Sequence, residues 1–291
     1  MRAEQTAGRR ARRGWLALDR LTRLWVRATG EHVDLAADRW LDGPSGALDR
    51  VGDDWLPAEA RRAAGTLADG GGLLPDMGAL SASGFDPGAL APDVRRFYEH
   101  TGGWRLEVWS QWCPAAWPFG WLITALFSRR LAQLSLPLRP LDTALGMDSR
   151  VVTVTLPDGS HAGTAWLRTL RSTGQTVYSG WYGTATPPRA PGPCVRVVFP
   201  LPQGRLVVLL QPAVGRGGSL RLLSAAGPSG GPGAYLVVDD PGRRGGRARR
   251  VPLHEEFLVY VDGEGVLRTD HALSLWRIPV VRLHYRLAPP S

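Results

Sequence analysis

The chain of 291 residues contains no lysine and no asparagine, and isoleucine occurs only at Ile123 and Ile278. All 35 basic residues are therefore arginines. The missing lysine excludes P-loop hydrolases, protein kinases, pyridoxal enzymes and Schiff-base aldolases, because each needs a lysine amine. The missing asparagine excludes N-glycosylation and an asparagine oxyanion donor. Because all three amino acids have AT-rich codons, we attribute their scarcity to a GC-rich genome.

Cysteine is also scarce, since only Cys113 and Cys194 are present. Two cysteines are too few for a cysteine-rich zinc site or a disulfide framework, so we expect free, buried thiols in a reducing cytoplasm. We expect neither a metal nor a cofactor. The formal net charge of +9 follows the same codon bias, so we give it little weight and do not expect nucleic acid as a partner.

A basic arm opens the chain and precedes an amphipathic segment. The arm contains four closely spaced arginines, Arg9, Arg10, Arg12 and Arg13. In residues 15–28, tryptophans and leucines share one side of a helix and charged residues share the other, which argues against a cleaved leader. We expect this helix to pack on its own protein, with binding of an anionic membrane surface as the alternative. The acidic block at 31–93, with 12 acidic residues and 4 arginines, offers the arm a partner within the chain.

One long uncharged stretch covers residues 108–128 and ends at two arginines. It is long enough to span a bilayer, but prolines, polar residues and scattered tryptophans lower its hydropathy. We expect a buried helix over about residues 119–134. Insertion at a membrane interface and a true membrane span are the alternatives.

Residues 1–93 and 94–291 differ in character. The first region contains short amphipathic pieces followed by a stretch rich in glycine and proline at 70–92, so we predict helices and a loosely ordered linker. From residue 104 onward, hydrophobic residues alternate with polar ones in short runs separated by turn signals. We predict an α+β protein whose helical N-terminal region precedes an antiparallel β-barrel or strongly curved sheet, capped by the helix at 119–134.

Three short runs carry a resemblance to known proteins: Arg96–Thr101 (RFYEHT), Leu134–Leu138 (LSLPL) and Leu283–Arg286 (LHYR). On these runs the chain resembles uncharacterised proteins of high-GC actinobacteria and the soluble C-terminal part of YndJ-like bacterial proteins. The resemblance covers about residues 94–288. It implies no activity, cofactor or catalytic residue.

Familiar catalytic motifs are missing apart from one GxSxG match at residues 227–231. A nucleophile elbow needs a strand before it and a helix after it, whereas this match lies in a glycine-rich loop between two predicted strands. We attribute it to chance. A second arginine loop contains Arg243, Arg244, Arg247, Arg249 and Arg250. We expect either arginine loop to be solvated, with an anionic surface as the alternative partner, and neither is interleaved with the aromatic residues that stack on single strands.

The most promising group of polar residues lies on the last two predicted hairpins. A turn at 262–265 would place Glu256 opposite His271, on the same sheet face as His254, Tyr260, His284 and Arg286. The simplest interpretation is an outer face with ordinary cross-strand ion pairs. If this face instead lines a polar interior, Glu256 and His271 become an acid–base pair. A metal site is not expected, because the register separates the other two histidines.

We consider three functions. We favour a non-catalytic module that binds an apolar small molecule or lipid, or that attaches peripherally to the inner face of a membrane. The first alternative is an enzyme that uses Glu256 and His271 for proton transfer. The second is an interaction module, for protein or nucleic acid, that works through the arginine loops. The sequence does not define the oligomeric state.

Overall fold

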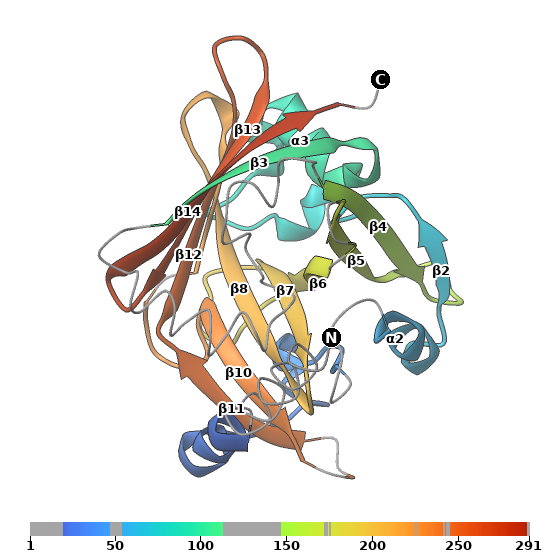
Figure 1. Cartoon of the computed structure of the whole chain (residues 1–291), viewed down its shortest axis with the longest axis vertical. Coiled ribbons are helices and arrows are strands. Elements are labelled where there is room, and N and C mark those ends of the chain that lie inside the picture. The colour runs from blue at the N-terminus through green and yellow to red at the C-terminus, as the bar shows by residue number, and fades with distance from the viewer. Residues whose placement is uncertain are drawn as a thin grey trace, which may run out of the picture.

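A computed structural model describes residues 20–46, 54–112, 147–171, 174, 176–224, 226–240, 242 and 245–289. Antiparallel strands dominate the described residues (Figure 1). The strands are β1 Glu31–Asp34, β2 Thr66–Asp69, β3 Arg105–Trp112, β4 Met147–Thr155, β5 His161–Leu170, β6 Thr176–Ala185, β7 Cys194–Leu201, β8 Gly204–Val214, β9 Leu220–Leu223, β10 Gly233–Asp239, β11 Gly245–Val251, β12 Leu253–Val261, β13 Leu267–Leu275 and β14 Ile278–Ala288.

Helices are short. The described residues include helical residues 20–29, α2 at Leu56–Arg62 and α3 at Pro92–Glu99. Single 3-10 turns lie at Arg39–Leu41, Met77–Leu80, Pro87–Ala89, Thr101–Gly103 and Arg216–Gly218. The helix expected at 119–134 lies outside the described residues.

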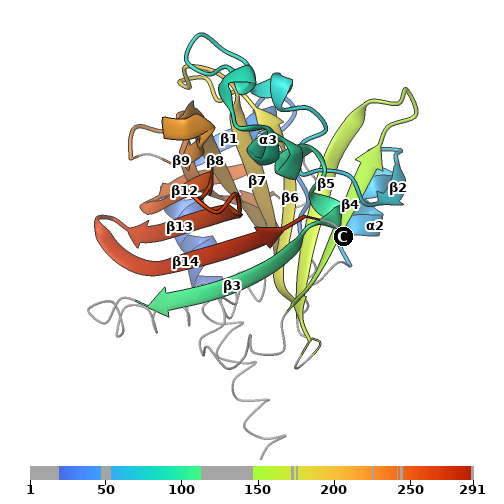
Figure 2. The ribbon, with the colours of Figure 1, turned by 90° about the horizontal axis from the view of Figure 1, so that it is seen from above.

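All strands belong to one sheet that bends at β8. Residues 204–209 of β8 lie between β7 and β10, whereas residues 211–214 pair with β9. This strand therefore joins a large half, β2-β4-β5-β6-β7-β8-β10-β11-β1, to a small half, β8-β9-β12-β13-β14-β3. In Figure 2 the strands of the small half run across those of the large half. A strand that switches between two sheet layers in this way forms the corner of an orthogonal packing.

The structure corrects the predicted fold class in two respects. The sheet is not closed into a barrel: β2 and β3 end its main path, β1 ends the branch through β10 and β11, and no backbone pairing joins these ends in the part of the chain that is described. Nor is the N-terminal region simply helical, because β1 pairs with β11 and β2 pairs with β4. The N-terminal strand β2 occupies the edge of β4, so β4 is not free to pair with β3.

Both faces of the large half are covered. On its outer face the N-terminal segment packs Leu41, Trp55 and Leu56 against the sheet, in a core that includes Trp181 and Tyr235. Burial on both faces explains why β7 and β8 read as nearly continuous hydrophobic runs rather than as alternating ones.

On the inner face, the segment between β2 and α3 packs into the second core. Leu73, Leu74, Met77 and Leu80 are almost fully buried there. The expectation of a loosely ordered linker at 70–92 was therefore wrong. The segment is fixed partly by Thr164 on β5, whose buried hydroxyl donates a hydrogen bond to the Gly72 carbonyl at 2.9 Å.

Candidate functional site

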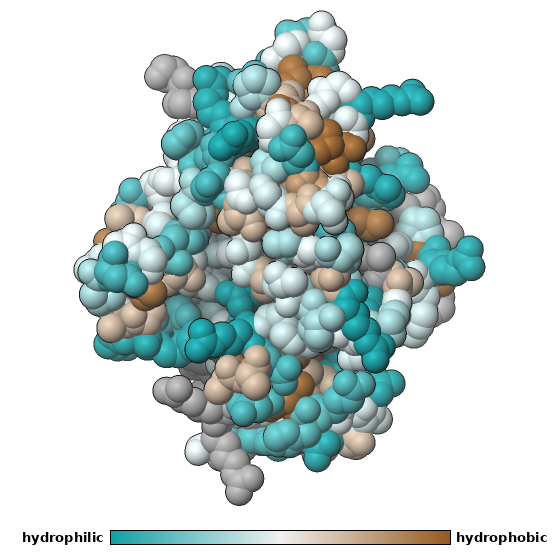
Figure 3. Space-filling view, turned by 180° about the vertical axis from the view of Figure 1, so that it is seen from behind, coloured by the Kyte–Doolittle hydropathy of each residue, from teal (hydrophilic) through white to brown (hydrophobic). Residues whose placement is uncertain are grey.

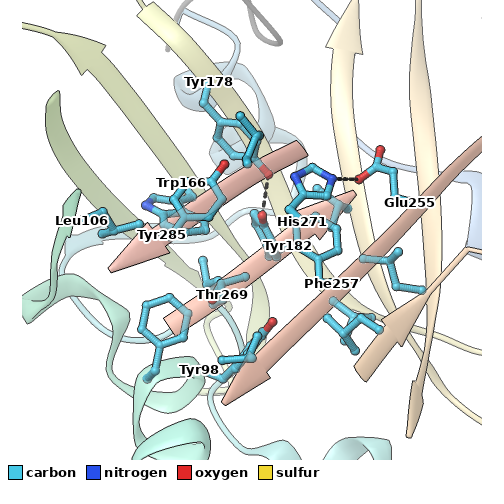
Figure 4. A pocket seen from close by; sticks show the side chains of 18 of the residues that line it. Tyr98, Leu106, Trp166, Tyr178, Tyr182, Glu255, Phe257, Thr269, His271 and Tyr285 are labelled. Carbon is cyan, nitrogen blue, oxygen red and sulfur yellow. Dashed lines mark hydrogen bonds and ion pairs between the residues drawn. The ribbon is translucent and has the colours of Figure 1, made fainter. Parts of the chain in front are cut away.

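A cavity lies within the inner core, between the two halves of the sheet and α3 (Figure 4). Its volume is about 80 Å³. Most of the side chains around it are aromatic or aliphatic. They are Leu73, Phe97, Tyr98, Leu106, Trp166, Arg168, Tyr178, Tyr182, Val195, Val197, Phe199, Leu210, Leu222, Glu255, Phe257, Val259, Thr269, His271, Leu283, Tyr285 and Leu287.

The large half contributes a buried cation. Arg168 on β5 is only 8% exposed, and its Nε has no hydrogen-bond partner. Its guanidinium carbon lies 3.9 Å from the ring centroid of Trp166 and 5.1 Å from those of Tyr178 and Tyr285. These rings hold the cation by cation–π attraction, which is strongest where water is excluded.

The small half contributes a carboxylate and an imidazole. Glu255 on β12 is 5% exposed, and its Oε2 lies 3.3 Å from Nε2 of His271 on β13. The His271 ring also stacks on Phe257, with centroids 3.8 Å apart and planes 14° apart. Oε1 of Glu255 and both ring nitrogens of His271 are buried without a hydrogen-bond partner, so the two groups lie 3.3 Å apart with no hydrogen bond between them. The pair therefore leaves polar atoms free for another group, and it has the composition needed for proton transfer.

Four tyrosines complete the polar part of the wall. The hydroxyl groups of Tyr178 and Tyr182 share a short hydrogen bond (Figure 4). Burial raises the pKa of Tyr98, Tyr178, Tyr182 and Tyr285 above the ordinary value, because it penalises the phenolate. All four hydroxyls are consequently neutral near pH 7 and can serve as hydrogen-bond donors.

The sequence placed His271 in a site but gave it the wrong partner. The predicted register put Glu256 opposite His271, whereas the observed register pairs Phe257 with His271 and Glu256 with Ala272. The turn is one residue longer than assumed: the Asp262 carboxylate accepts hydrogen bonds from the backbone N–H groups of Glu264 and Val266, so the last strand pair is Val261 with Leu267. A slip of one residue exchanges the faces of a strand.

Glu256 consequently points away from the cavity. It forms an exposed ion pair with Arg221 at 2.6 Å. The other members of the predicted polar face lie outside the cavity lining as well. His254 contacts the Ser224 carbonyl at 3.2 Å, His284 contacts Asp270 at 2.6 Å, Arg286 lies 3.6 Å from Glu107, and Tyr260 is partly exposed.

The described members of the second arginine loop contact the protein itself. Arg247 and Arg249 donate to the carbonyls of Gly30 and Thr29, and Arg250 donates to the Pro232 carbonyl. These bonds occupy part of each guanidinium, and those of Arg247 and Arg249 join β11 to the N-terminal segment. Arg243, Arg244 and the arm containing Arg9, Arg10, Arg12 and Arg13 lie outside the described residues.

The GxSxG match, metal-binding residues and the cysteines were also considered in the sequence. Ser229, the central residue of the GxSxG match, lies in a loop and its hydroxyl contacts Glu31 at 3.2 Å. No group of three histidine, cysteine or acidic residues suited to a metal occurs in the described ranges. Cys194 is a buried free thiol, and burial raises its pKa to about 12.

Sequence reasoning missed Arg168, Glu255 and the tyrosines. A signal for Arg168 was present: it stands two residues after Trp166 on one strand, so both side chains share a face. On the next strand Tyr178 and Tyr182 also share one face, because they are four residues apart. The wall that β5 and β6 contribute to the cavity therefore has a recognisable pattern. One strand places an arginine and a tryptophan on the same face, and the next strand places two tyrosines on one face.

The chain is similar to the uncharacterized membrane protein YndJ of Bacillus subtilis (strain 168), with 29% identity over 248 residues. The match covers 82% of this chain and 41% of YndJ, so the chain spans less than half the length of that relative. This confirms the resemblance to YndJ-like proteins as a weak homology, over a longer stretch than residues 94–288. No family model and no solved structure matches the chain.

Among the helices that the structure describes, none is long and apolar enough to cross a membrane.

Proposed function

We propose that the protein binds a small organic molecule with an apolar part and a few polar groups in the cavity, without changing it chemically. One observation carries this proposal: a mostly apolar wall surrounds polar atoms that are buried and have no partner, on Arg168, Glu255 and His271. Ligand sites have this composition, because apolar surface supplies affinity and a few placed polar groups fix the orientation.

Energetics favour an occupant. Each buried polar atom without a partner costs about 1–3 kcal/mol. The cavity of about 80 Å³ is large enough for a few water molecules or one small solute, either of which would satisfy these atoms. A solute with an apolar body also contacts the aromatic wall, which water does not favour. A bound molecule therefore makes better use of the whole cavity than water does.

The test is ligand-observed NMR with isobutanol, a small neutral probe with an apolar body and one hydroxyl, together with native mass spectrometry of the full chain for a co-purified molecule. A Val197→Phe variant fills the cavity, because Val197 is buried in its wall. The matched control is Val214→Phe, since Val214 is half-buried and does not line the cavity. Circular dichroism checks that both variants keep their strands.

We expect saturation transfer to isobutanol with the wild type and with Val214→Phe, and little with Val197→Phe. A co-purified molecule should likewise be lost only from Val197→Phe. If the wild type carries no molecule and shows no transfer, or if Val197→Phe behaves as the wild type does, the proposal is wrong.

A second candidate function is peripheral attachment to the cytoplasmic face of a membrane, in a high-GC actinobacterium. The observation that favours it is the helix at 20–29, which buries Val26 but leaves Leu21 and Leu24 more than 60% exposed. The YndJ relative is named a membrane protein. Against a broad membrane-binding face, Figure 3 shows hydrophobic residues in separate small patches among hydrophilic ones on the face away from the viewer of Figure 1. Of the exposed large hydrophobic side chains among the described residues, Leu21, Leu24 and Trp25 lie together on this helix.

A further inference from the structure

Arg168 is a buried positive charge without an anionic partner among the described residues. Its environment consists of aromatic rings, and its Nε is unsatisfied. A buried charge that is left unpaired is strongly unfavourable, and cation–π contacts offset this cost only in part. An anion in the cavity would supply the missing charge and accept hydrogen bonds from the guanidinium.

The opposite wall has a different character. There, Oε2 of Glu255 lies 3.3 Å from Nε2 of His271, and Oε1 of Glu255 has no hydrogen-bond partner. This wall therefore suits a neutral donor such as a hydroxyl group rather than a second charge. Arg168 and Glu255 both line this cavity, together with Tyr178 and Tyr182. One molecule in the cavity therefore has both charged side chains in its wall.

Volume limits the size of that molecule. A protein cavity of roughly 150 Å³ holds benzene, and the present cavity of about 80 Å³ is about half as large. Molecules of about four to six non-hydrogen atoms fit this space.

We propose that the ligand is a short-chain hydroxycarboxylate, with its carboxylate on the Arg168 guanidinium and its hydroxyl donating to Glu255. This inference rests on the proposed ligand-binding function and names its ligand class. Glu255 lies beside His271 and forms no ion pair with Arg168, so one ligand carboxylate balances the guanidinium, whereas the second charge of a phosphate would stay uncompensated in the apolar wall. The aliphatic carbons of the ligand then face the aromatic side chains.

The first experiment compares three probes on the full-length wild-type chain by ligand-observed NMR titration: propionate, its neutral isostere propionamide, and lactate. Propionate and propionamide have nearly the same shape, so their difference reports the charge alone. We expect propionate to bind about tenfold tighter than propionamide, and lactate to bind about fivefold tighter than propionate. Equal or tighter binding of propionamide would overturn the inference without any variant.

The second experiment uses variants. Arg168→Gln should remove the preference for propionate over propionamide, and Glu255→Gln should remove the preference for lactate over propionate. The control is Arg221→Gln, which removes an exposed arginine on the outer face and should change neither ratio.

Binding of isobutanol distinguishes a wrong ligand class from a wrong ligand site. If isobutanol binds in a Val197-dependent way but carboxylates bind no better than the amide, the cavity is a ligand site and the hydroxycarboxylate assignment is wrong. If isobutanol and all three probes fail to bind, the proposed function fails with it.

Discussion

At the scale of single residues, Gly163 shows how tightly the sheet is packed around Trp181. A Cβ at Gly163 would lie 2.2 Å from Cζ2 and 2.3 Å from Cε2 of the Trp181 ring. The ring cannot move aside easily, since it is 2% exposed and meets Trp55 edge to face at 5.9 Å. The position therefore requires glycine for reasons of space.

We predict that Gly163→Ala lowers the free energy of unfolding by about 2–3 kcal/mol through overpacking. Urea denaturation followed by tryptophan fluorescence measures the change. Gly84→Ala is the control, because nothing lies within 4 Å of a Cβ built there. A loss below about 0.5 kcal/mol for Gly163→Ala, the size expected of an ordinary surface change, would show that the ring yields.

Single residues also explain why the sequence identified His271 but not its partner. His271 was identifiable as a residue of interest, but its partner depended on the length of one turn. Hydrophobic alternation alone did not decide it, because Glu255 and Glu256 are adjacent and either face contains a glutamate. The Asp262 carboxylate, which accepts two backbone N–H groups, set the register. Hydrogen bonds of this kind are hard to foresee from a sequence, although here they determine the register of two strands.

At the scale of elements, most strands after residue 147 follow from alternation and turn residues, and their antiparallel pairing was predicted correctly. The short strands β1 and β2 were not predictable in the same way. Each has four residues and is mostly exposed, so it lacks the hydrophobic periodicity that marks a strand. Their place is determined by distant partners, β11 and β4, rather than by their own residues.

The helix at 20–29 supports a prediction about membranes. Leu21, Leu24 and Trp25 are exposed there, while the side chain of Val26 is fully buried against the protein. We predict that the full chain co-sediments with vesicles containing anionic lipid at low salt, and that the double change Leu21→Ser and Leu24→Ser reduces the bound fraction several-fold. Apolar burial and attraction of nearby arginines would both contribute.

The matched control for the vesicle experiment is Leu67→Ser. Leu67 is another exposed leucine, 45% accessible, but it lies on β2 and not on the helix. If the helix variant and this control bind vesicles equally well, peripheral attachment through the helix is excluded.

At the scale of the whole molecule, the buried tyrosines tie stability to alkaline pH. Burial raises the pKa of all four cavity tyrosines above the ordinary value near 10. A group whose pKa is higher in the folded state stabilises the fold fully below its unfolded pKa. That contribution is lost as the pH rises above it. Each of the four tyrosines therefore lowers the free energy of unfolding by up to about 1 kcal/mol per pH unit as the pH rises from its unfolded toward its folded pKa, and the four losses act in the same direction.

We predict that the chain unfolds cooperatively between about pH 10 and pH 12, because this loss approaches the total stability of an ordinary domain. Tyrosinate absorbance at 295 nm and far-ultraviolet circular dichroism, recorded on the same samples, should change together. Ionisation of most tyrosines while the strand signal stays native would contradict the prediction and show that the cavity admits hydroxide.

The pairing of β1 with β11 has a consequence for synthesis on the ribosome. Glu31 pairs with Ala248 and Asp34 pairs with Gly245, so more than 200 residues separate the partners along the chain. Such distant pairing is slow, because the chain must lose the entropy of closing a long loop before the stabilising contacts can form. Strand β1 leaves the ribosome more than 200 residues before β11 and has no partner until β11 has been translated. During that interval its edge is unpaired and open to chaperones, and the speed at which the intervening residues are translated sets how long it stays so.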